Sequence, residues 1–237
     1  MLAYENVKAG ILEYIKNNHL KSGDQLPTEK ELSEYLEVGR LSLREGLNAL
    51  KSEGIILSVR GKGTFVACSS DHIADTLNVN SSVTDMIRCS GYEPGVSYFE
   101  KQIVKADQAV SEALMVDEGI DVPVCVRVRT ADGVPVVLTK DHFAPALAAA
   151  FLGLNEAEMS IYRYVENTCD IKIGVSTTEI IPQCADEKIA ETLNIPVGTP
   201  VLVLQATVTD IYGTPLIYAY ECFRADKFKF VVTRGKP

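Results

Sequence analysis

The chain has 237 residues, of which 46% are hydrophobic and 23% are charged. This length allows one large or two ordinary domains, and the balance is typical of a folded protein and excludes a wholly disordered chain. No stretch approaches the roughly 20 apolar residues of a membrane-spanning helix, and the charged first ten residues do not resemble a secretion signal. Six widely spaced cysteines without a CxxC pair predict free thiols and no zinc site. We therefore expect a cytoplasmic protein without a membrane partner.

The net charge of −9 at first argues against a nucleic acid partner. The negative excess lies entirely in residues 68–237, however, because residues 1–67 carry nine basic and nine acidic side chains. Between residues 38 and 63 there are five basic side chains and two acidic ones. Screening cuts off distant charges beyond roughly 8–10 Å. The basic segment can therefore attract DNA even though the rest of the chain is acidic.

The N-terminal third begins with two predicted helices. Apolar side chains recur at helical spacing between Tyr4 and Ile15, which indicates an amphipathic helix. A turn is expected at residues 21–24. Thr28 and Glu31 then have the spacing of a capping box, which predicts the start of a second, short helix.

A third helix is expected from about residue 40 to residue 52. Its buried side is predicted to carry Leu43, Leu47 and Leu50. At 100° per residue, Arg40, Arg44 and Lys51 fall within about 40° of one another, away from the leucines. This helix therefore presents a basic stripe on its exposed side.

A β-hairpin is predicted after the third helix. Two β-prone runs, 55–59 and 64–66, flank the glycine-rich basic tip 60–63. Glycines let a backbone approach phosphate closely, and the two cations of the tip supply charge. Helix, helix, helix and hairpin in this order are typical of a winged helix-turn-helix, in which the third helix enters the major groove.

Each of these features has an ordinary explanation when it stands alone. Two helix arginines four residues apart usually line a solvated face, and a glycine-rich tip is an ordinary hairpin turn. The tip is also too short for a dinucleotide fingerprint. The combination in this order and spacing favours DNA binding.

The run LPTEKELSEYLEVGRLSLREGLNALKSEGIILSVRGKGTFV, residues 26–66, closely resembles the DNA-binding domain of the GntR family of bacterial transcription regulators. The resemblance implies DNA contacts from Thr28, Lys30, Arg40, Leu41, Ser42, Arg44, Arg60, Gly61 and Lys62. Gly39 and Gly46 depart from the common pattern, which has Ser or Thr and alanine there. Leu41 also departs from it, because a polar residue is frequent at that position, and a leucine can contact a thymine methyl group.

Residues 68–80 are polar and weakly patterned, and we expect them to form a linker between a DNA-binding domain over 1–67 and a second domain over 81–237. A short helix is predicted near Val83 and Ile87, ending before the turn at 91–95.

The second domain contains an internal repeat, residues 106–143 and 185–223. The matched pairs include Asp107 and Asp186, Leu114 and Leu193, Gly119 and Gly198, and Phe143 and Phe223. Each half is predicted to form helix, turn, strand, turn and strand, which gives an α+β fold with an antiparallel sheet and helices on one side. We expect a cleft between the two halves.

The halves differ in charge on their first strand. Alternation places Arg127 and Arg129 on one face, about 7 Å apart, whereas the matching stretch 204–209 is uncharged. Two adjacent guanidiniums repel one another unless an anion or a carboxylate lies between them, and arginine suits bidentate recognition of phosphate or carboxylate. The alternative is a solvent-exposed strand face.

Residues 83–233 resemble the effector-binding (UTRA) domain of the HutC subfamily of these regulators, whose fold is similar to chorismate lyase. The resemblance rests on RVRTADGVPVVL, MSIYRYVEN and ECFRADKFKF. It implies an effector site formed by Arg127, Arg129, Asp141, Ser160, Tyr162, Tyr218 and Glu221. Ile217 departs from the pattern, because many sugar-sensing members have Glu there.

An enzyme is the main alternative from another class of function. The three histidines His19, His72 and His142 belong to no recognisable catalytic motif, and there is no Gly-x-Ser-x-Gly elbow, His-Glu-x-x-His or phosphate-binding loop. A fold similar to a lyase does not imply lyase activity. A purely architectural DNA-binding protein would leave the acidic C-terminal region without a purpose.

The sequence therefore predicts a ligand-responsive transcription regulator, most simply a repressor, that is not an enzyme and uses no cofactor or metal. Its expected partners are palindromic double-stranded operator DNA, a small anionic effector and a second copy of the chain. The expected effector is a phosphorylated sugar or an organic acid. The sequence leaves the identity of the effector and of the operator open.

Overall fold

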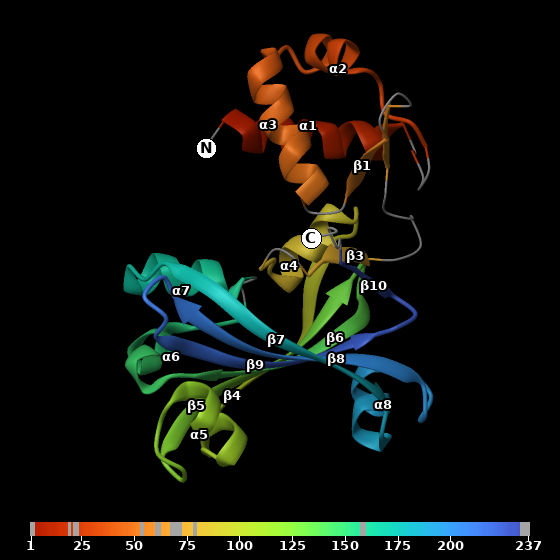
Figure 1. The fold of residues 1–237 in the computed structure, drawn as a ribbon. Helices are drawn as coiled ribbons and strands as arrows, with labels where there is room; N and C mark the ends of the chain where they lie inside the picture. Colours follow the sequence, from red (N-terminus) through yellow and green to blue (C-terminus); the bar gives the residue numbers. More distant parts are fainter. Residues whose placement is uncertain are drawn as a thin grey trace, which may run out of the picture. The chain divides into compact units, whose positions relative to one another are not determined.

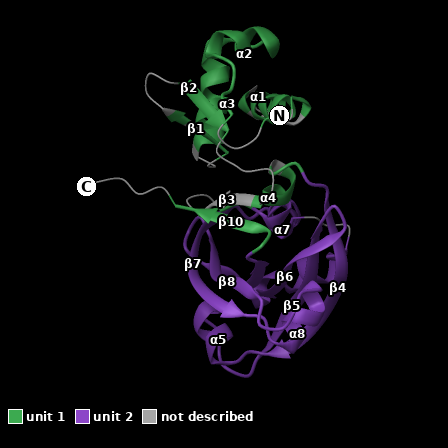
Figure 2. Ribbon diagram, turned by 90° about the vertical axis from the view of Figure 1, so that its right-hand side faces the viewer, with its two compact units in different colours: residues 1–81, 85–91, 226–237 green, residues 82–84, 92–225 purple. Residues whose placement is uncertain are grey.

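The computed structural model describes residues 3–18, 20, 24–52, 55–59, 63–66, 73–77, 80–156 and 160–232. It divides into two compact units (Figure 2). The first comprises residues 1–81, 85–91 and 226–237, and the second comprises 82–84 and 92–225. Each unit is described by itself.

The first unit begins with three helices and a hairpin, as predicted (Figure 1). Their bounds are α1 Ala3–Asn17, α2 Glu29–Tyr35, α3 Arg40–Ser52, β1 Ile56–Val59 and β2 Gly63–Val66. The capping box is also confirmed, because the Thr28 hydroxyl accepts a hydrogen bond from the Glu31 N–H while the Glu31 carboxylate accepts one from the Thr28 N–H. The predicted leucines of α3 are buried together with Val7 and Ile11 of α1.

The segment expected to be only a linker contains a strand. β3 Ile73–Thr76 pairs in parallel with β10 Phe228–Val231, and Ile73 is buried. Residues 226–237 consequently group with the first unit instead of closing the second one. A four-residue strand whose partner is distant in the sequence has no local sequence pattern that predicts the pairing.

The second unit is built on a six-stranded sheet in the order β4-β5-β6-β9-β8-β7, with every neighbouring pair antiparallel (Figure 1). The strands are β4 Pro94–Lys105, β5 Asp121–Ala131, β6 Val134–Phe143, β7 Ile173–Cys184, β8 Pro200–Asp210 and β9 Pro215–Arg224. Its helices are α5 Gln108–Leu114, η1 Pro145–Leu147, α6 Ala148–Gly153, α7 Ile161–Cys169 and α8 Glu187–Leu193. The residues of α4 Val83–Cys89 are divided between the two units.

The predicted repeat is confirmed in detail. Asp107 and Asp186 cap α5 and α8 in the same way, each accepting from the backbone N–H three residues later. Gly119 and Gly198 share a left-handed backbone, with φ of 82° and 83°, at equivalent turns. The two halves meet where β6 pairs with β9, so they form one continuous sheet. The expected cleft between the halves is therefore replaced by a row of strand hydrogen bonds.

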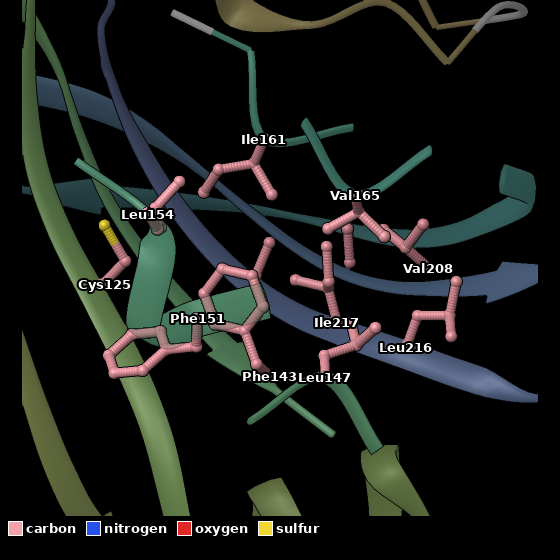
Figure 3. Packing of buried hydrophobic residues seen from close by; sticks show 12 residues of the cluster. Cys125, Phe143, Leu147, Phe151, Leu154, Ile161, Val165, Val208, Leu216 and Ile217 are labelled. Carbon is pink, nitrogen blue, oxygen red and sulfur yellow. The ribbon is translucent and has the colours of Figure 1, made fainter. Parts of the chain in front are cut away.

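Helices cover both faces of the sheet, which corrects the prediction of helices on one side. The repeated helices α5 and α8 pack on one face, in clusters with Val122 and Val124 respectively. α6 and α7 pack on the opposite face, where Phe151 and Val165 join Cys125 in a third cluster (Figure 3). α6 and α7 lie between the two repeats in the chain, so the repeat pattern did not include them.

Candidate functional site

The exposed side of α3 carries the predicted DNA-contacting residues. Arg40 and Arg44 are exposed, and Leu41 is 76% exposed. Exposure of a leucine side chain to water is unfavourable in the free protein. A leucine beside arginines on a helix is suited to contact a thymine methyl group in a major groove. Ser42, also predicted at this surface, is half-buried.

Arg44 is held by a residue of another helix. Its Nε donates to Oε2 of Glu29 over 2.9 Å, from α3 to the first turn of α2. The other predicted cation on α2, Lys30, lies 3.9 Å from Glu34 within its own helix. The sequence analysis did not anticipate the Arg44–Glu29 pair, because its partners are 15 residues apart and belong to no local pattern.

Thr28 has a structural role in the capping box, and its hydroxyl also donates to Glu31 over 2.8 Å. These hydrogen bonds hold the pKa of the Glu31 carboxyl below its ordinary value. The predicted wing residues Arg60, Gly61 and Lys62 lie outside the described residues. The strands on both sides of that tip are paired through Val59 and Gly63.

Arg127 and Arg129 are buried in the second unit, with exposures of 6% and 1%. The alternative of a solvated strand face is therefore wrong for these two residues. Nη2 of Arg127 lies 3.3 Å from Oδ2 of Asp141, and the Thr139 hydroxyl donates to the same carboxylate oxygen over 3.3 Å. Asp141, one of the predicted effector residues, is thus an ion-pair partner of Arg127.

Arg129 reaches a helix that the predicted site did not include. Its Nη2 donates to the hydroxyl of Thr84 in α4 over 2.7 Å, and its Nε donates to the Gly95 carbonyl over 3.4 Å. Thr84 is itself only 1% exposed. No sequence signal distinguished this threonine within its short helix.

The strand register places Glu221 on the face that carries the arginines. Arg127 is paired with Thr139 on β6, and Thr139 with Glu221 on β9, and such cross-strand partners share a face. α7 covers this same face through Ile161 and Val165 (Figure 3). Ser160 caps α7, and Tyr162 packs against the same cluster. Six of the seven predicted effector residues therefore belong to one side of the sheet.

Tyr218 is the exception and corrects the prediction. It is paired with His142 on the opposite face, where it packs against the cluster around α5. Successive side chains of a strand alternate between faces, so Tyr218 and Glu221 point to opposite sides. The match of Tyr218 to a family position did not show to which face of the sheet its side chain points.

Lys101 is a further residue that sequence reasoning missed. It lies on the arginine face, paired with Cys125, and its Nζ donates to the carbonyls of Phe151, Leu152 and Leu154 over 3.2, 2.9 and 3.0 Å. A cation at the carbonyl end of a helix is favourable. Lys101 thus fixes the end of α6 immediately before the segment that leads to Ser160.

Burial shifts the pKa of two titratable groups of this unit. Burial raises the pKa of the Cys125 thiol to about 12, which keeps it protonated and unreactive at neutral pH. Burial also lowers the pKa of His142, which lies on the other face of the sheet. Among the residues that the structure describes, no three His, Cys, Asp or Glu side chains are grouped to hold a metal ion. No helix in the described part of the chain is long and apolar enough to cross a membrane.

Two family models match the chain. Residues 3–66 match the model of the bacterial regulatory proteins of the gntR family, and residues 90–229 match the UTRA domain. The chain is 28% identical to the HTH-type transcriptional repressor NagR of Bacillus subtilis over 96% of this chain and 93% of that protein. It is also 28% identical to the HTH-type transcriptional regulator Rv0792c of Mycobacterium tuberculosis over 97% of this chain and 83% of that protein.

Solved structures share the fold. The possible transcriptional regulator YydK from Bacillus subtilis superposes with a TM-score of 0.67 at 24% identity, covering 99% of this chain and all of that one. PhnF from Mycobacterium smegmatis superposes with a TM-score of 0.62 at 24% identity, covering 98% of this chain and all of that one. The relatives are DNA-binding transcription regulators and not enzymes.

Proposed function

Because this chain belongs to the GntR family of bacterial regulatory proteins and carries a UTRA domain, we propose that it is a transcriptional repressor controlled by a small anionic metabolite. Its role as a DNA-binding regulator with an effector-binding domain follows from the family. The repressor role is supported by the resemblance to NagR, which is named a repressor. The anionic class of the effector is supported by the charges inside the second unit.

The single observation that carries the anion proposal is a buried excess of positive charge. Among the described residues, three charged side chains are buried, namely Arg127, Arg129 and Asp141. Two guanidiniums and one carboxylate leave one positive charge in excess, and buried charge is costly unless an opposite charge accompanies it. A phosphate or carboxylate group on the effector would balance this charge, and arginine can bind such a group through two parallel hydrogen bonds.

The surrounding residues suit a polar metabolite. Ser160 at the start of the nine-residue helix α7 is buried and supplies a hydroxyl beside a helix N-terminus, where anions are favoured. Glu221 and Tyr162 are half-buried and can recognise hydroxyl or amine groups of the same ligand. We assign Arg127 and Arg129 to the acid group and Ser160, Tyr162 and Glu221 to the remainder.

The DNA-binding surface is assigned to α3 and the wing. Arg40, Arg44 and Leu41 would contact base edges, and Lys30, Ser42 and the wing residues Arg60 and Lys62 the backbone. We propose that the chain acts in the cytoplasm as a homodimer on a palindromic operator, because helix-turn-helix dimers place two recognition helices one helical turn of DNA apart. Assignment to the HutC subfamily is part of the same proposal.

Calorimetry tests the anion site. The wild type, Arg129→Lys and Arg129→Ala are titrated with inorganic phosphate, hexose 6-phosphates and dicarboxylic acids. We expect at least one acid to bind the wild type, and we expect both variants to lose most of that affinity, because a lysine cannot reproduce the bidentate fork. Lys140→Ala is the control, since Lys140 lies on the other face over the Tyr220 ring.

Circular dichroism and thermal unfolding of each variant show whether it is folded before it is titrated. Binding of the acid by a folded Arg129→Lys variant at wild-type affinity would place the effector elsewhere. Tight binding of a neutral sugar with no acid binding would overturn the anionic assignment.

A further inference from the structure

A hollow of about 600 Å³ lies in the first unit, between α1 and α2. This volume is within the usual range for small-molecule sites, roughly 300–1,000 Å³. All of the residues that line the hollow belong to the first unit, whereas Arg127 and Arg129 belong to the second. The hollow is therefore separate from the proposed anion site.

Two tyrosine rings form one wall of the hollow. Tyr14 of α1 and Tyr35 of α2 meet edge to face, with ring centroids 4.9 Å apart and an interplanar angle of 82°. Tyr35 remains 56% exposed in spite of this contact. The half-buried side chains of Leu20 and Pro27 extend the apolar lining. Because the faces of aromatic rings attract cations, this wall suits a ligand with an apolar body and a positive charge.

Glu31 supplies the charge of the hollow. Among the described residues that line it, Glu31 is the only charged one. The Thr28 N–H and hydroxyl both donate to Oε2 of Glu31, over 2.7 and 2.8 Å, so Oε1 is left to accept a hydrogen bond from a ligand. The same bonds hold the pKa of the carboxyl below its ordinary value, so it is ionised at neutral pH. The neighbouring Lys30 lies 3.9 Å from Glu34, its partner one turn further along α2.

We propose that this hollow binds a primary amine with an aromatic body. The ammonium group donates to Oε1 of Glu31, and the ring lies against Tyr14 and Tyr35. A neutral ligand of the same shape lacks the charge-assisted hydrogen bond, and an anionic one is repelled by the carboxylate. This class of ligand has the opposite charge to the effector proposed for the second unit. Amine binding therefore does not depend on the anion site.

An amine in this hollow would act on DNA binding directly. Thr28, which lines the hollow, and Lys30, which follows Glu31 by one position toward the start of α2, both belong to the predicted DNA-contacting residues. A bound ammonium group neutralises Glu31 close to the phosphates, so affinity for all DNA sequences should rise. This effect rests on the DNA-binding surface proposed above, whereas amine binding itself does not.

Fluorine NMR of the full chain tests the binding site. The ten tyrosines are replaced by 3-fluorotyrosine, and the signals of Tyr14, Tyr35 and Tyr212 are assigned with Tyr→Phe variants. The probes are phenethylamine, 2-phenylethanol and phenylacetate, which share a ring and are respectively cationic, neutral and anionic at pH 7. We expect phenethylamine to shift the Tyr14 and Tyr35 signals saturably, with weaker binding of the alcohol and none of the acid. Tyr212, which is 87% exposed in the second unit, should not respond.

Glu31→Gln removes the charge and keeps the capping box, because glutamine also serves at this position of the box. We expect it to lower the affinity for phenethylamine roughly 2- to 5-fold, the range of an exposed charge pair. Affinity for 2-phenylethanol should not change, which separates loss of the charge from damage to the hollow. Glu34→Gln is the matched control in the same helix and should bind phenethylamine like the wild type.

Anisotropy titrations test the effect on DNA. Operator DNA, selected from random sequence by the wild-type chain, and scrambled DNA are titrated in phenethylammonium chloride and in potassium chloride at equal ionic strength. The amine should raise both affinities of the wild type by roughly 2- to 5-fold at low salt. Glu31→Gln should show the raised affinities without the amine and gain nothing from it.

Three results would overturn these assignments in distinguishable ways. Equal affinities of phenethylamine and 2-phenylethanol for the wild type, or no shift at Tyr14 and Tyr35, would show that the hollow is not an amine site. Binding of phenethylamine with unchanged DNA affinity would refute the effect on DNA and leave the amine site in place. Failure of the wild type to bind any DNA would overturn the proposed DNA-binding function, without bearing on the NMR result.

Discussion

Nε of Arg44 on the exposed face of α3 donates to Oε2 of Glu29 on α2 over 2.9 Å. The pair joins α2 to α3, the helix to which we assign the base contacts. Both side chains are well exposed, at 65% and 46%, so the pair contributes little to stability, about 0–1 kcal/mol. The pair instead sets the orientation of Arg44, because the carboxylate fixes the direction of the guanidinium before DNA binds.

Glu29→Gln should raise affinity for non-specific DNA and lower discrimination. The substitution removes a negative charge near the phosphates, and it releases Arg44 from a fixed orientation. Glu34→Gln is the matched control, because Glu34 pairs with Lys30 at 3.9 Å and not with Arg44. Anisotropy titrations on operator and scrambled DNA measure both effects. An unchanged ratio of specific to non-specific affinity in Glu29→Gln would refute the orienting role.

Arg44→Ala should cost roughly 1–3 kcal/mol of operator binding if Arg44 reads a base edge, with the loss confined to one position of the site. Lys62→Ala should instead weaken binding to all sequences alike and flatten the dependence of log Kd on log salt. Mobility-shift titrations at several salt concentrations separate these effects. If both variants keep wild-type operator affinity, the assigned DNA-binding surface is wrong.

Gly46→Ala should destabilise the first unit, although alanine is the better helix former. A Cβ at position 46 would lie 2.6 Å from Cγ1 and 2.9 Å from Cβ of Val7, which is buried in α1. Overpacking costs about 1–3 kcal/mol, against a gain of about 1 kcal/mol in helix propensity. Urea unfolding measures the net loss. The double variant with Val7→Ala should recover part of it, and strictly additive losses would show that the two sites do not touch.

Asp141→Asn should lower the melting temperature and make the protein more responsive to phosphate. The substitution removes the carboxylate that pairs with buried Arg127, so an added anion takes over part of its role. Differential scanning fluorimetry in phosphate and in chloride at equal ionic strength measures this response. Asp121→Asn is the control, since it breaks an exposed ion pair with Lys105. Equal stabilisation of Asp141→Asn and the wild type by phosphate would count against an anion near Arg127.

Acidification should destabilise the second unit through His142. Burial lowers its pKa in the folded chain, so the unfolded chain binds a proton there more readily. The stability is fully present above the unfolded pKa of about 6.5 and falls as the pH drops from there toward the folded pKa. His142→Gln should flatten the dependence of unfolding free energy on pH in this window. Tyr218→Phe, which keeps the tilted neighbouring ring and the backbone carbonyl, should leave it unchanged.

Local signals made most of the architecture predictable. The Thr28–Glu31 spacing located the start of α2, because a cap depends on residues within one turn. The internal repeat, in which Asp107 matches Asp186, located the helices α5 and α8. The Arg127 and Arg129 pair was visible as a break in the repeat. Its burial was not, because α6 and α7, which cover that face, lie outside the repeated pattern.

The remainder depends on contacts between residues that are far apart in the sequence. Tyr218 was assigned to the effector site by position, whereas the register with β6 directs it to the other face. β3 pairs with β10, and Arg129 donates a hydrogen bond to Thr84. Both contacts join distant segments, and the sequence between those segments carries no signal that predicts the contact. Each of these required the tertiary structure.

The most direct test of the account is an operator-binding titration of the wild type and of Arg129→Lys in the presence of the acid that binds most tightly in calorimetry. The account predicts that the acid weakens operator binding by the wild type roughly 5- to 150-fold. It predicts that Arg129→Lys binds the operator with unchanged affinity and no longer responds. An acid that binds the wild type at Arg129 and leaves operator affinity unchanged would contradict it.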